Sequence, residues 1–322
     1  MGVGSDEAID NLLRCFCTPG KDKILTCPPT YGMYTVSACV NDISVVPVPL
    51  LVNDNFRVDV PKVLDTLSNN PDVKVIYLCS PGNPTGTLIQ KEDVVPILEH
   101  PTWNGIVVLD EAYIDFAPDG ASLAEWVLEW PNLVVMQTLS KAFGLAGIRL
   151  GAAFADPAVA GLLNNLKAPY NISNPTSQIA QAALQASNLE VMRTNRQRIL
   201  EQRDRLIVEL PKIPGIGKFK GGYTSNFLLV EMLDAPNGKP SNEVALKVYE
   251  TLAENRGVVV RFRGKEIGCM GCLRITVGTK EEVDRFLKEI ESVLASIYAG
   301  DDAKVDMKTE EAKEKAANGV LA

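Results

Sequence analysis

The sequence predicts an α/β protein with a large three-layer α/β/α domain on a mostly parallel sheet, followed by a smaller C-terminal α/β domain. Short apolar runs alternate with helical patterns along residues 1–205, and this alternation is typical of parallel strands that helices cover on both faces. After Pro211 the pattern changes, and a new set of strand-like and helical segments follows. We expect the large domain in residues 1–205, the small domain in 206–298 and a charged, disordered tail in 299–322.

Local patterns predict the elements of both domains. A first helix begins at the capping sequence Ser5-Asp6-Glu7. Apolar runs predict large-domain strands at 23–25, 45–48, 73–78, 106–109 and 133–136. Periodic apolar positions predict a helix over 34–40 and a long amphipathic helix over 188–210. In the small domain, the same criteria predict strands at 227–230, 258–260 and 273–277 and helices over 242–255 and 280–297.

Composition excludes several classes of function. The net charge is −8 and no block of Lys and Arg occurs, which argues against a nucleic-acid or membrane partner, because both need a basic face. No apolar run approaches the length of a membrane span, and Met1 leads into Gly2 without a signal peptide. The seven cysteines are an odd number and lie mostly in apolar segments. We therefore expect a cytoplasmic protein with reduced thiols.

Two features that often carry chemistry are interpreted here as structural. The single histidine, His100, precedes Pro101 at an expected helix end, where an imidazole more often contacts carbonyl groups than acts in catalysis. Cys269 and Cys272 form a CxxC pair, but a zinc site needs four ligands and no second pair matches. A redox pair would open a helix, whereas this one precedes a strand, so we expect a turn with two packed thiols.

The strongest functional motif is SKAFGLAGIRLG, residues 140–151. Lys141 follows a buried strand and precedes small residues, so its amine should point into a cleft at the carboxyl edge of the sheet. A lysine in such a place can form a Schiff base with an aldehyde cofactor. Arg149 and the hydroxyl groups of Thr138 and Ser140 can bind a phosphate group at the same place.

Polar groups also follow two other expected strands. Asp110 ends one of them and stands three residues before Tyr113. A buried carboxylate there can stabilise the protonated ring nitrogen of pyridoxal phosphate (PLP), which the cofactor needs to act as an electron sink. Asn83 lies in a turn rich in Pro and Gly. Asn83 and Tyr113 can contact the phenolic oxygen of the same cofactor.

The beginning of the sequence offers an anion site. Gly2-Val3-Gly4 runs directly into the helix that contains Ser5 and Asp6, and free amides together with the helix dipole favour a phosphate there. Tyr31, in the segment 28–34, can stack on the ring of the cofactor. Each segment by itself is an ordinary loop or cap, and only their combination indicates a site.

Together these stretches resemble the fold-type I aminotransferases and, more closely, the histidinol-phosphate aminotransferase family. The resemblance runs from Gly2 to about Ile297 and is strongest in the segments GSDEAI (4–9), PPTYGMY (28–34), DEAY (110–113) and CLRITVG (272–278). It implies a PLP-dependent homodimer that moves an amino group between histidinol phosphate and 2-oxoglutarate, with glutamate as the partner amino acid, in histidine biosynthesis.

The resemblance also implies roles for individual residues. The catalytic residues would be Lys141 as the Schiff-base lysine and proton carrier, Asp110 at the pyridine nitrogen, and Tyr113. Further cofactor contacts would come from Ser5, Asp6, Tyr31, Asn83, Thr138, Ser140 and Arg149. Arg261 and Arg274 would hold the anionic group of the substrate, since one arginine pair can bind either a phosphate or a carboxylate.

Other functions stay open at this point. The arginine pair also suits a broad aromatic aminotransferase or a phosphothreonine decarboxylase of the same subfamily. Members of the family carry a further N-terminal segment, with an arm that reaches the partner subunit, and we expect this chain to lack it. A protein without the arm could bind PLP weakly and be catalytically silent.

Overall fold

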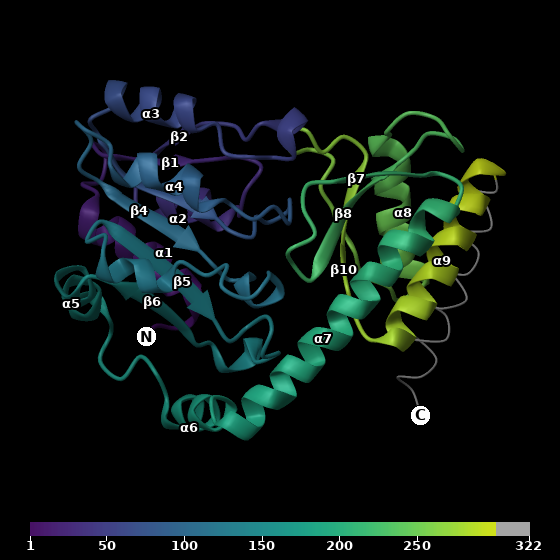
Figure 1. Ribbon diagram of the computed structural model, residues 1–322. Coiled ribbons are helices and arrows are strands. Elements are labelled where there is room, and N and C mark those ends of the chain that lie inside the picture. Colours follow the sequence, from purple (N-terminus) through teal and green to yellow (C-terminus); the bar gives the residue numbers. More distant parts are fainter. Residues whose placement is uncertain (301–322) are drawn as a thin grey trace, which may run out of the picture. The chain divides into compact units, whose positions relative to one another are not determined.

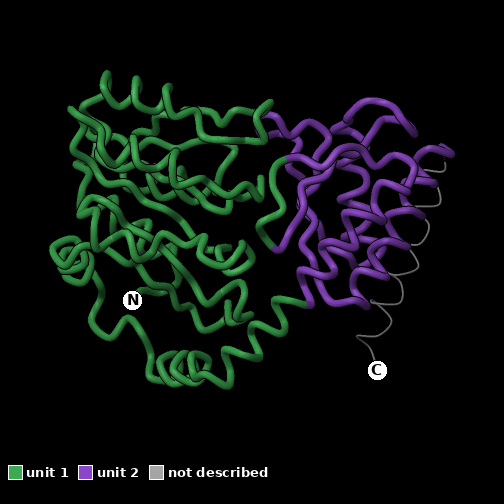
Figure 2. Tube along the Cα trace, in the orientation of Figure 1, with its two compact units in different colours: residues 1–197, 221–225 green, residues 198–220, 226–322 purple. Residues whose placement is uncertain are grey.

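The computed structural model describes residues 1–300, which divide into two compact units (Figures 1 and 2). Unit 1 comprises residues 1–197 and 221–225, and unit 2 comprises residues 198–220 and those from 226 onward. The boundary between the units falls inside helix α7 (Ala186–Glu209). Apart from residues 299 and 300, the tail expected at 299–322 lies outside the described residues.

Unit 1 is built on a six-stranded sheet in the order β2-β1-β3-β4-β5-β6. Its strands are β1 (Lys23–Thr26), β2 (Ser44–Pro47), β3 (Val73–Cys79), β4 (Ile106–Asp110), β5 (Leu133–Thr138) and β6 (Gly151–Ala155). Neighbouring strands are parallel except for β6, which runs antiparallel to β5. The predicted, mostly parallel sheet is therefore confirmed. Sequence reasoning missed β6, because its sequence GAAFA lacks the Val- and Leu-rich run of the other strands.

Helices cover both faces of this sheet (Figure 1). Successive strand side chains point to opposite faces. Ile76 and Leu109 pack with helices α3 and α4, whereas Tyr77 and Val108 pack on the other face with α1, α2 and α5. The result is the expected three-layer sandwich. The helices of unit 1 ahead of α7 are α1 (Gly4–Phe16), α2 (Met33–Val40), α3 (Val60–Asn69), α4 (Lys91–Leu98), α5 (Pro157–Leu166) and α6 (Asn174–Ala183).

The carboxyl ends of three parallel strands meet at one edge of the sheet. Cys79 at the end of β3 pairs with Asp110 on β4, and Asp110 pairs with Met136 on β5. The loops that leave these strands contain Asn83 and Lys141. Parallel pairing therefore gathers polar residues that lie far apart in the sequence.

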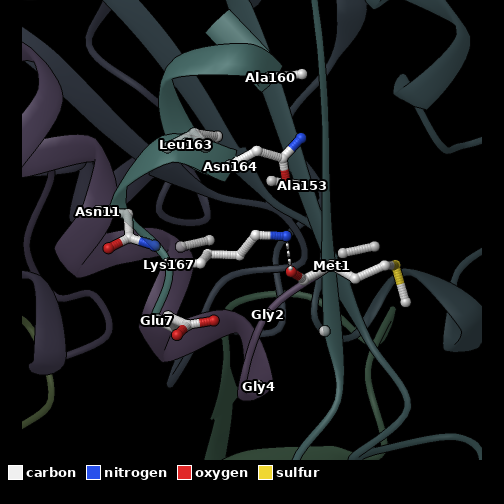
Figure 3. Close-up of a pocket in the computed structure, with 13 residues that line it drawn as sticks. Met1, Gly2, Gly4, Glu7, Asn11, Ala153, Ala160, Leu163, Asn164 and Lys167 are labelled. Atoms are coloured by element: carbon white, nitrogen blue, oxygen red, sulfur yellow. Dashed lines mark hydrogen bonds between the residues drawn. The ribbon is translucent and has the colours of Figure 1, made fainter. Parts of the chain in front are cut away.

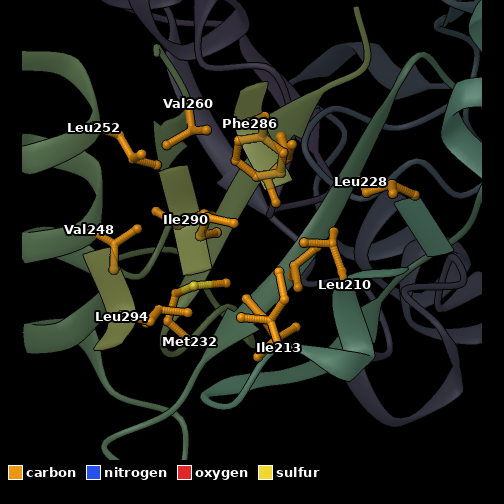
Figure 4. Close-up of a cluster of buried hydrophobic side chains, with 14 of the residues drawn as sticks. Leu210, Ile213, Leu228, Met232, Val248, Leu252, Val260, Phe286, Ile290 and Leu294 are labelled. Carbon is orange, nitrogen blue, oxygen red and sulfur yellow. The ribbon is translucent and has the colours of Figure 1, made fainter. Parts of the chain in front are cut away.

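Unit 2 contains a four-stranded antiparallel sheet in the order β7-β8-β10-β9. Its elements are β7 (Ile216–Lys220), β8 (Phe227–Met232), α8 (Asn242–Asn255), β9 (Arg261–Phe262), β10 (Cys272–Thr276) and α9 (Lys280–Tyr298). Leu228, Ile290 and Leu294 belong to the apolar core of this unit (Figure 4). Within residues 1–300 no helix is long and apolar enough to cross a membrane.

Two expectations differ from the structure around unit 2. The strand predicted at 258–260 does not form. The amide of Val258 bonds to the carbonyl of Leu252 near the end of α8, and on this edge of the sheet β10 pairs only with Arg261 and Phe262 of β9. Helix α7 forms, but Leu206 is its single fully buried residue. The predicted apolar stripe is incomplete because only the C-terminal part of α7 packs on the core of unit 2. Strand β7 was not predicted.

Candidate active site

One pocket of unit 1 is lined by residues from the strand ends and from the start of α1. It brings together all ten residues that the sequence predicts for a cofactor site, and these residues come from separate segments of the chain. The other two predicted residues, Arg261 and Arg274, belong to unit 2. The pocket is lined by Ser5, Asp6, Tyr31, Cys79, Asn83, Asp110, Ala112, Tyr113, Thr138, Ser140, Lys141, Ala146 and Arg149.

The start of α1 is suited to an anion. The helix begins after Val3 without a capping side chain, so its first backbone amides can serve a ligand. Arg149 reaches the same place, with its Nη2 atom 3.4 Å from Oδ2 of Asp6. Glycine is required at position 4, because its φ is +73° and a Cβ atom would lie 2.6 Å from Nη2 of Arg149. The close approach of backbone and guanidinium creates a group of donors for a phosphate.

Two hydroxyl groups follow β5 in the same pocket. Oγ1 of Thr138 lies 2.9 Å from Oγ of Ser140 and 3.1 Å from the carbonyl oxygen of Leu150. Backbone bonds of 2.9 and 3.0 Å between Gly2 and Gly151 join the chain before α1 to the beginning of β6. The loop between β5 and β6 is thereby fixed against the start of α1, so donors from both segments can act together.

Asp110 is a buried carboxylate at the end of β4, with 2% of its surface exposed. Its Oδ2 accepts a hydrogen bond of 2.7 Å from the hydroxyl of Tyr34, and its Oδ1 accepts one of 3.2 Å from the amide of Ala112. Burial raises the pKa of Asp110, and the two hydrogen bonds oppose that rise. The positive charge of Lys141 also lowers the pKa of Asp110, but its effect is smaller than that of burial or of either hydrogen bond. A cationic ligand group beside Asp110 would therefore be stabilised.

Sequence reasoning missed Tyr34. Its ring is fully buried and stacks on Tyr77, with ring centres 4.7 Å apart and an angle of 14° between the planes. Tyr31 lines the pocket instead, and its hydroxyl donates to Oδ1 of Asp6 over 3.1 Å. The available signal was weak: Tyr34 belongs to the same segment 28–34 as Tyr31, but Tyr31 precedes α2 and Tyr34 lies in its first turn, so helical spacing does not relate the two side chains.

Lys141 is exposed and lines the pocket. Its Nζ lies 5.3 Å from the centre of the Tyr113 ring. Tyr113 and Asn83 are both buried and line the same pocket. An accessible amine beside an aromatic ring and a buried carboxylate can bind a carbonyl group covalently.

The remaining reactive side chains have structural surroundings. Burial, with the charge of Asp110, raises the pKa of the Cys79 thiol to about 12, so it stays protonated and is a poor nucleophile. The Nε2 of His100 lies 3.1 Å from the carbonyl oxygen of Leu64; this contact is structural, as expected, but the carbonyl belongs to α3 and not to the helix that ends before His100. Cys269 and Cys272 are buried in a turn closed by a 2.9 Å backbone bond. Within residues 1–300 no cluster of three His, Cys, Asp or Glu could hold a metal ion.

A second pocket lies beside α1, α5 and β6 (Figure 3). Its charged side chains form hydrogen bonds to neighbouring groups of the protein. Oε2 of Glu7 accepts hydrogen bonds from the amide of Val3 (2.7 Å) and from the side chain of Asn171 (3.0 Å). Nζ of Lys167 donates to the carbonyl oxygen of Met1 over 3.1 Å. The lysine amine of this pocket is therefore bound to a backbone carbonyl, and its carboxylate, Glu7, is only partly buried.

Arg261 and Arg274 lie directly opposite each other on the antiparallel strands β9 and β10. The guanidinium carbon of Arg274 is 4.9 Å from the centre of the Phe227 ring. Arg261 is exposed and Arg274 is half-buried. The predicted substrate arginines are thus immediate neighbours within unit 2.

The donor set of the first pocket fits pyridoxal phosphate. An amine, a buried carboxylate, an aromatic ring and an anion site match the aldehyde, ring nitrogen, ring face and phosphate of that cofactor. The fold and the pocket define a PLP-dependent enzyme of fold type I.

Comparison with known proteins identifies the family. The chain matches the aminotransferase class I and II family over residues 1–290. It is 54% identical over 299 residues to histidinol-phosphate aminotransferase of Schizosaccharomyces pombe, covering 92% of this chain and 77% of that protein. It is 49% identical over 297 residues to the Saccharomyces cerevisiae enzyme of that name, covering 91% and 75%. The chain belongs to the class I and II aminotransferases and, among them, to the histidinol-phosphate aminotransferase family.

Solved structures agree in fold. Histidinol-phosphate aminotransferase from Sinorhizobium meliloti in complex with pyridoxal-5′-phosphate matches with a TM-score of 0.81 at 24% identity, covering 92% of this chain and 76% of that one. The Clostridium acetobutylicum enzyme matches with a TM-score of 0.79 at 24% identity, covering 92% and 83%. These structures confirm the predicted fold type, and the family match confirms the predicted enzyme class with its PLP cofactor.

Proposed function

We propose that the protein transfers an amino group between L-histidinol phosphate and 2-oxoglutarate in histidine biosynthesis, as a cytoplasmic homodimer. One observation carries this proposal. The amine of Lys141, the carboxylate of Asp110 and the guanidinium of Arg149 line one pocket, in a chain 54% identical to a histidinol-phosphate aminotransferase.

In this proposal the cofactor is held at both ends. Its phosphate is bound by the first amides of α1, by Arg149 and by the hydroxyl groups after β5, and Asp110 pairs with its ring nitrogen. When bound, PLP supplies an electron sink for the charge that forms at the substrate Cα after loss of a proton. The proposed cofactor contacts are Ser5, Asp6, Tyr31, Asn83, Asp110, Tyr113, Thr138, Ser140, Lys141 and Arg149.

The side chains of the protein then position groups and move a proton. Lys141 is exposed and lines the pocket, so its amine, once free, can take the proton from the substrate Cα and hold it at Nζ. Asp110 holds a proton at the ring nitrogen, because a buried carboxylate favours a neighbouring cation. Tyr113 and Asn83 orient the phenolic oxygen.

Arg261 and Arg274 are proposed to select the substrates. Their direct opposition on β9 and β10 presents two guanidinium groups from one sheet, and planar guanidinium groups bind phosphates and carboxylates in a bidentate way. One pair can therefore serve the phosphate of histidinol phosphate and the side-chain carboxylate of glutamate in alternate halves of the reaction.

The test is a half-reaction. Purified protein with PLP is mixed with L-histidinol phosphate, and the absorbance spectrum follows conversion of the cofactor to its amine form, which 2-oxoglutarate should reverse. We expect kcat/KM for histidinol phosphate to exceed that for L-phenylalanine or L-tyrosine at least about tenfold. A preference for the aromatic amino acids, or carbon dioxide release from phosphothreonine, would contradict the proposed substrate. Sedimentation of the same sample tests the homodimer.

A further inference from the structure

We propose that Tyr34 is a positioning residue for Asp110, and that its buried hydroxyl orients the carboxylate for pairing with the ring nitrogen of the cofactor. The inference rests on the proposed role of Asp110, but not on the identity of the amino substrate. Tyr34 does not line the cofactor pocket, so it would act through the lining residues that its hydroxyl contacts, Asp110 and the neighbouring Cys79.

The hydrogen bond between the two side chains is short and buried. The Tyr34 hydroxyl lies 2.7 Å from Oδ2 of Asp110, and the two residues are 0% and 2% exposed. A hydrogen bond from a neutral donor to a carboxylate at this distance is among the stronger protein hydrogen bonds. The other oxygen, Oδ1, is held by the backbone amide of Ala112. Tyr34 is thus the side-chain half of a two-point support.

Packing fixes the position of the donor. The Tyr34 ring is stacked on Tyr77 and meets the Tyr31 ring edge-on, with ring centres 5.6 Å apart and planes at 87°. The Tyr77 hydroxyl donates to the carbonyl oxygen of Ile9 over 2.9 Å, which ties the stack to α1. A phenol held in this way has little rotational freedom left, so its hydroxyl presents one direction to Asp110.

The hydrogen bond also favours the charged form of Asp110. Burial acts to raise the pKa of Asp110, and the bond from Tyr34 is the largest contribution that lowers it. The pKa of Tyr34 is itself raised well above its ordinary value, chiefly by burial and then by the charge of Asp110. The phenol therefore keeps its proton and remains a donor. Without this bond the carboxyl group would more readily be neutral, and a neutral carboxyl group stabilises a pyridinium less.

The experiment compares two tyrosines and two ligands. Tyr34→Phe removes the hydroxyl that touches Asp110, and Tyr77→Phe removes an equally buried hydroxyl that bonds to the backbone instead. Dissociation constants are measured for PLP and for its 1-deaza analogue, in which carbon replaces the ring nitrogen. The readout is the ratio of the two constants, because losses of general packing affect both ligands alike.

We expect the parent to prefer PLP, Tyr34→Phe to reduce that preference about tenfold, and Tyr77→Phe to keep it within twofold. Tyr34→His, which can still donate a proton, should restore part of the preference and serves if Tyr34→Phe does not fold. An unchanged ratio in Tyr34→Phe, or an equal loss in Tyr77→Phe, would overturn the proposal. The measurement contains no amino substrate. Its result can therefore be interpreted even if the proposed substrate is wrong.

Discussion

The guanidinium of Arg149 lies 3.4 Å from the carboxylate of Asp6, which joins the segment after β5 to the first turn of α1. The two side chains are 47% and 41% exposed, so the pair by itself adds little to stability. Arg149 also has a left-handed backbone, with φ of +52°, a conformation that costs energy in a residue other than glycine. A ligand that needs the guanidinium at this place explains the arrangement better than stability does.

Arg149→Lys should therefore weaken PLP binding about tenfold to a hundredfold, because an ammonium group cannot make the paired hydrogen bonds of a guanidinium to phosphate. Titration of the cofactor-free protein with PLP, followed by fluorescence, measures this loss. Arg14→Lys is the matched control, since Arg14 lies on α1, the helix that contains Asp6, and pairs there with Asp10 over 3.9 Å. If the two variants bind PLP equally, Arg149 has no special part in the phosphate site.

Lys141→Ala should abolish covalent attachment of the cofactor and leave the fold intact, because the side chain is exposed and contributes little to the core. Borohydride reduction in the presence of PLP, followed by peptide mass spectrometry, should find the modified lysine at Lys141 in the parent and none in the variant. Lys62→Ala, at an exposed position on α3, should keep the modification. Reduced cofactor on another lysine of Lys141→Ala would show that the assignment is wrong.

Asp110→Asn should make the cofactor-free protein more stable near neutral pH, by about 1 kcal/mol. The pKa of Asp110 is raised in the folded state above its ordinary value of 3.8, mainly by burial. The contribution of Asp110 to the free energy of unfolding is therefore fully present below pH 3.8, and it is lost as the pH rises through the pKa of Asp110 in the folded state. The advantage of Asp110→Asn over the parent should shrink as the pH is lowered, and urea unfolding at several pH values measures it.

Asp22→Asn provides the control of opposite sign for this pH dependence. Burial acts to raise the pKa of Asp22, but hydrogen bonds from Thr18, including one of 2.7 Å from its amide, lower it overall. Asp22→Asn should therefore be less stable than the parent near neutral pH, and this deficit should shrink on acidification. An Asp110→Asn variant that behaves like Asp22→Asn would show that the buried carboxylate is stabilising.

Arg274→Ala should raise KM for histidinol phosphate and for glutamate at least about tenfold, because the same guanidinium is proposed to bind both anions. Steady-state kinetics with each amino donor measure the change. An uncharged amine substrate is the control, since its KM should change little. Equal loss with that amine would show that Arg274, which also contacts the ring of Phe227, acts through the folding of unit 2.

Much of the pocket could be predicted because its residues follow strands that local patterns identify. Asp110 stands where an apolar run ends and Lys141 follows another run by five residues, and parallel strands place their carboxyl ends at one edge. The short antiparallel strands of unit 2 were harder to predict from the sequence. Arg261 and Phe262 form β9 only through pairing with β10, and a strand of two residues has no pattern of its own. The roles of the individual site residues remain predictions for the experiments above.

The sequence by itself determined the alternation of strands and helices and the chemical types gathered at the strand ends, because periodicity and turn residues act over short distances along the chain. The tertiary structure alone decided which distant groups touch. Tyr34 meets Asp110 across 76 positions of sequence, and Gly4 admits the guanidinium of Arg149. These contacts depend on how α1 and α2 pack on the sheet, and no local pattern records the direction in which a packed side chain points.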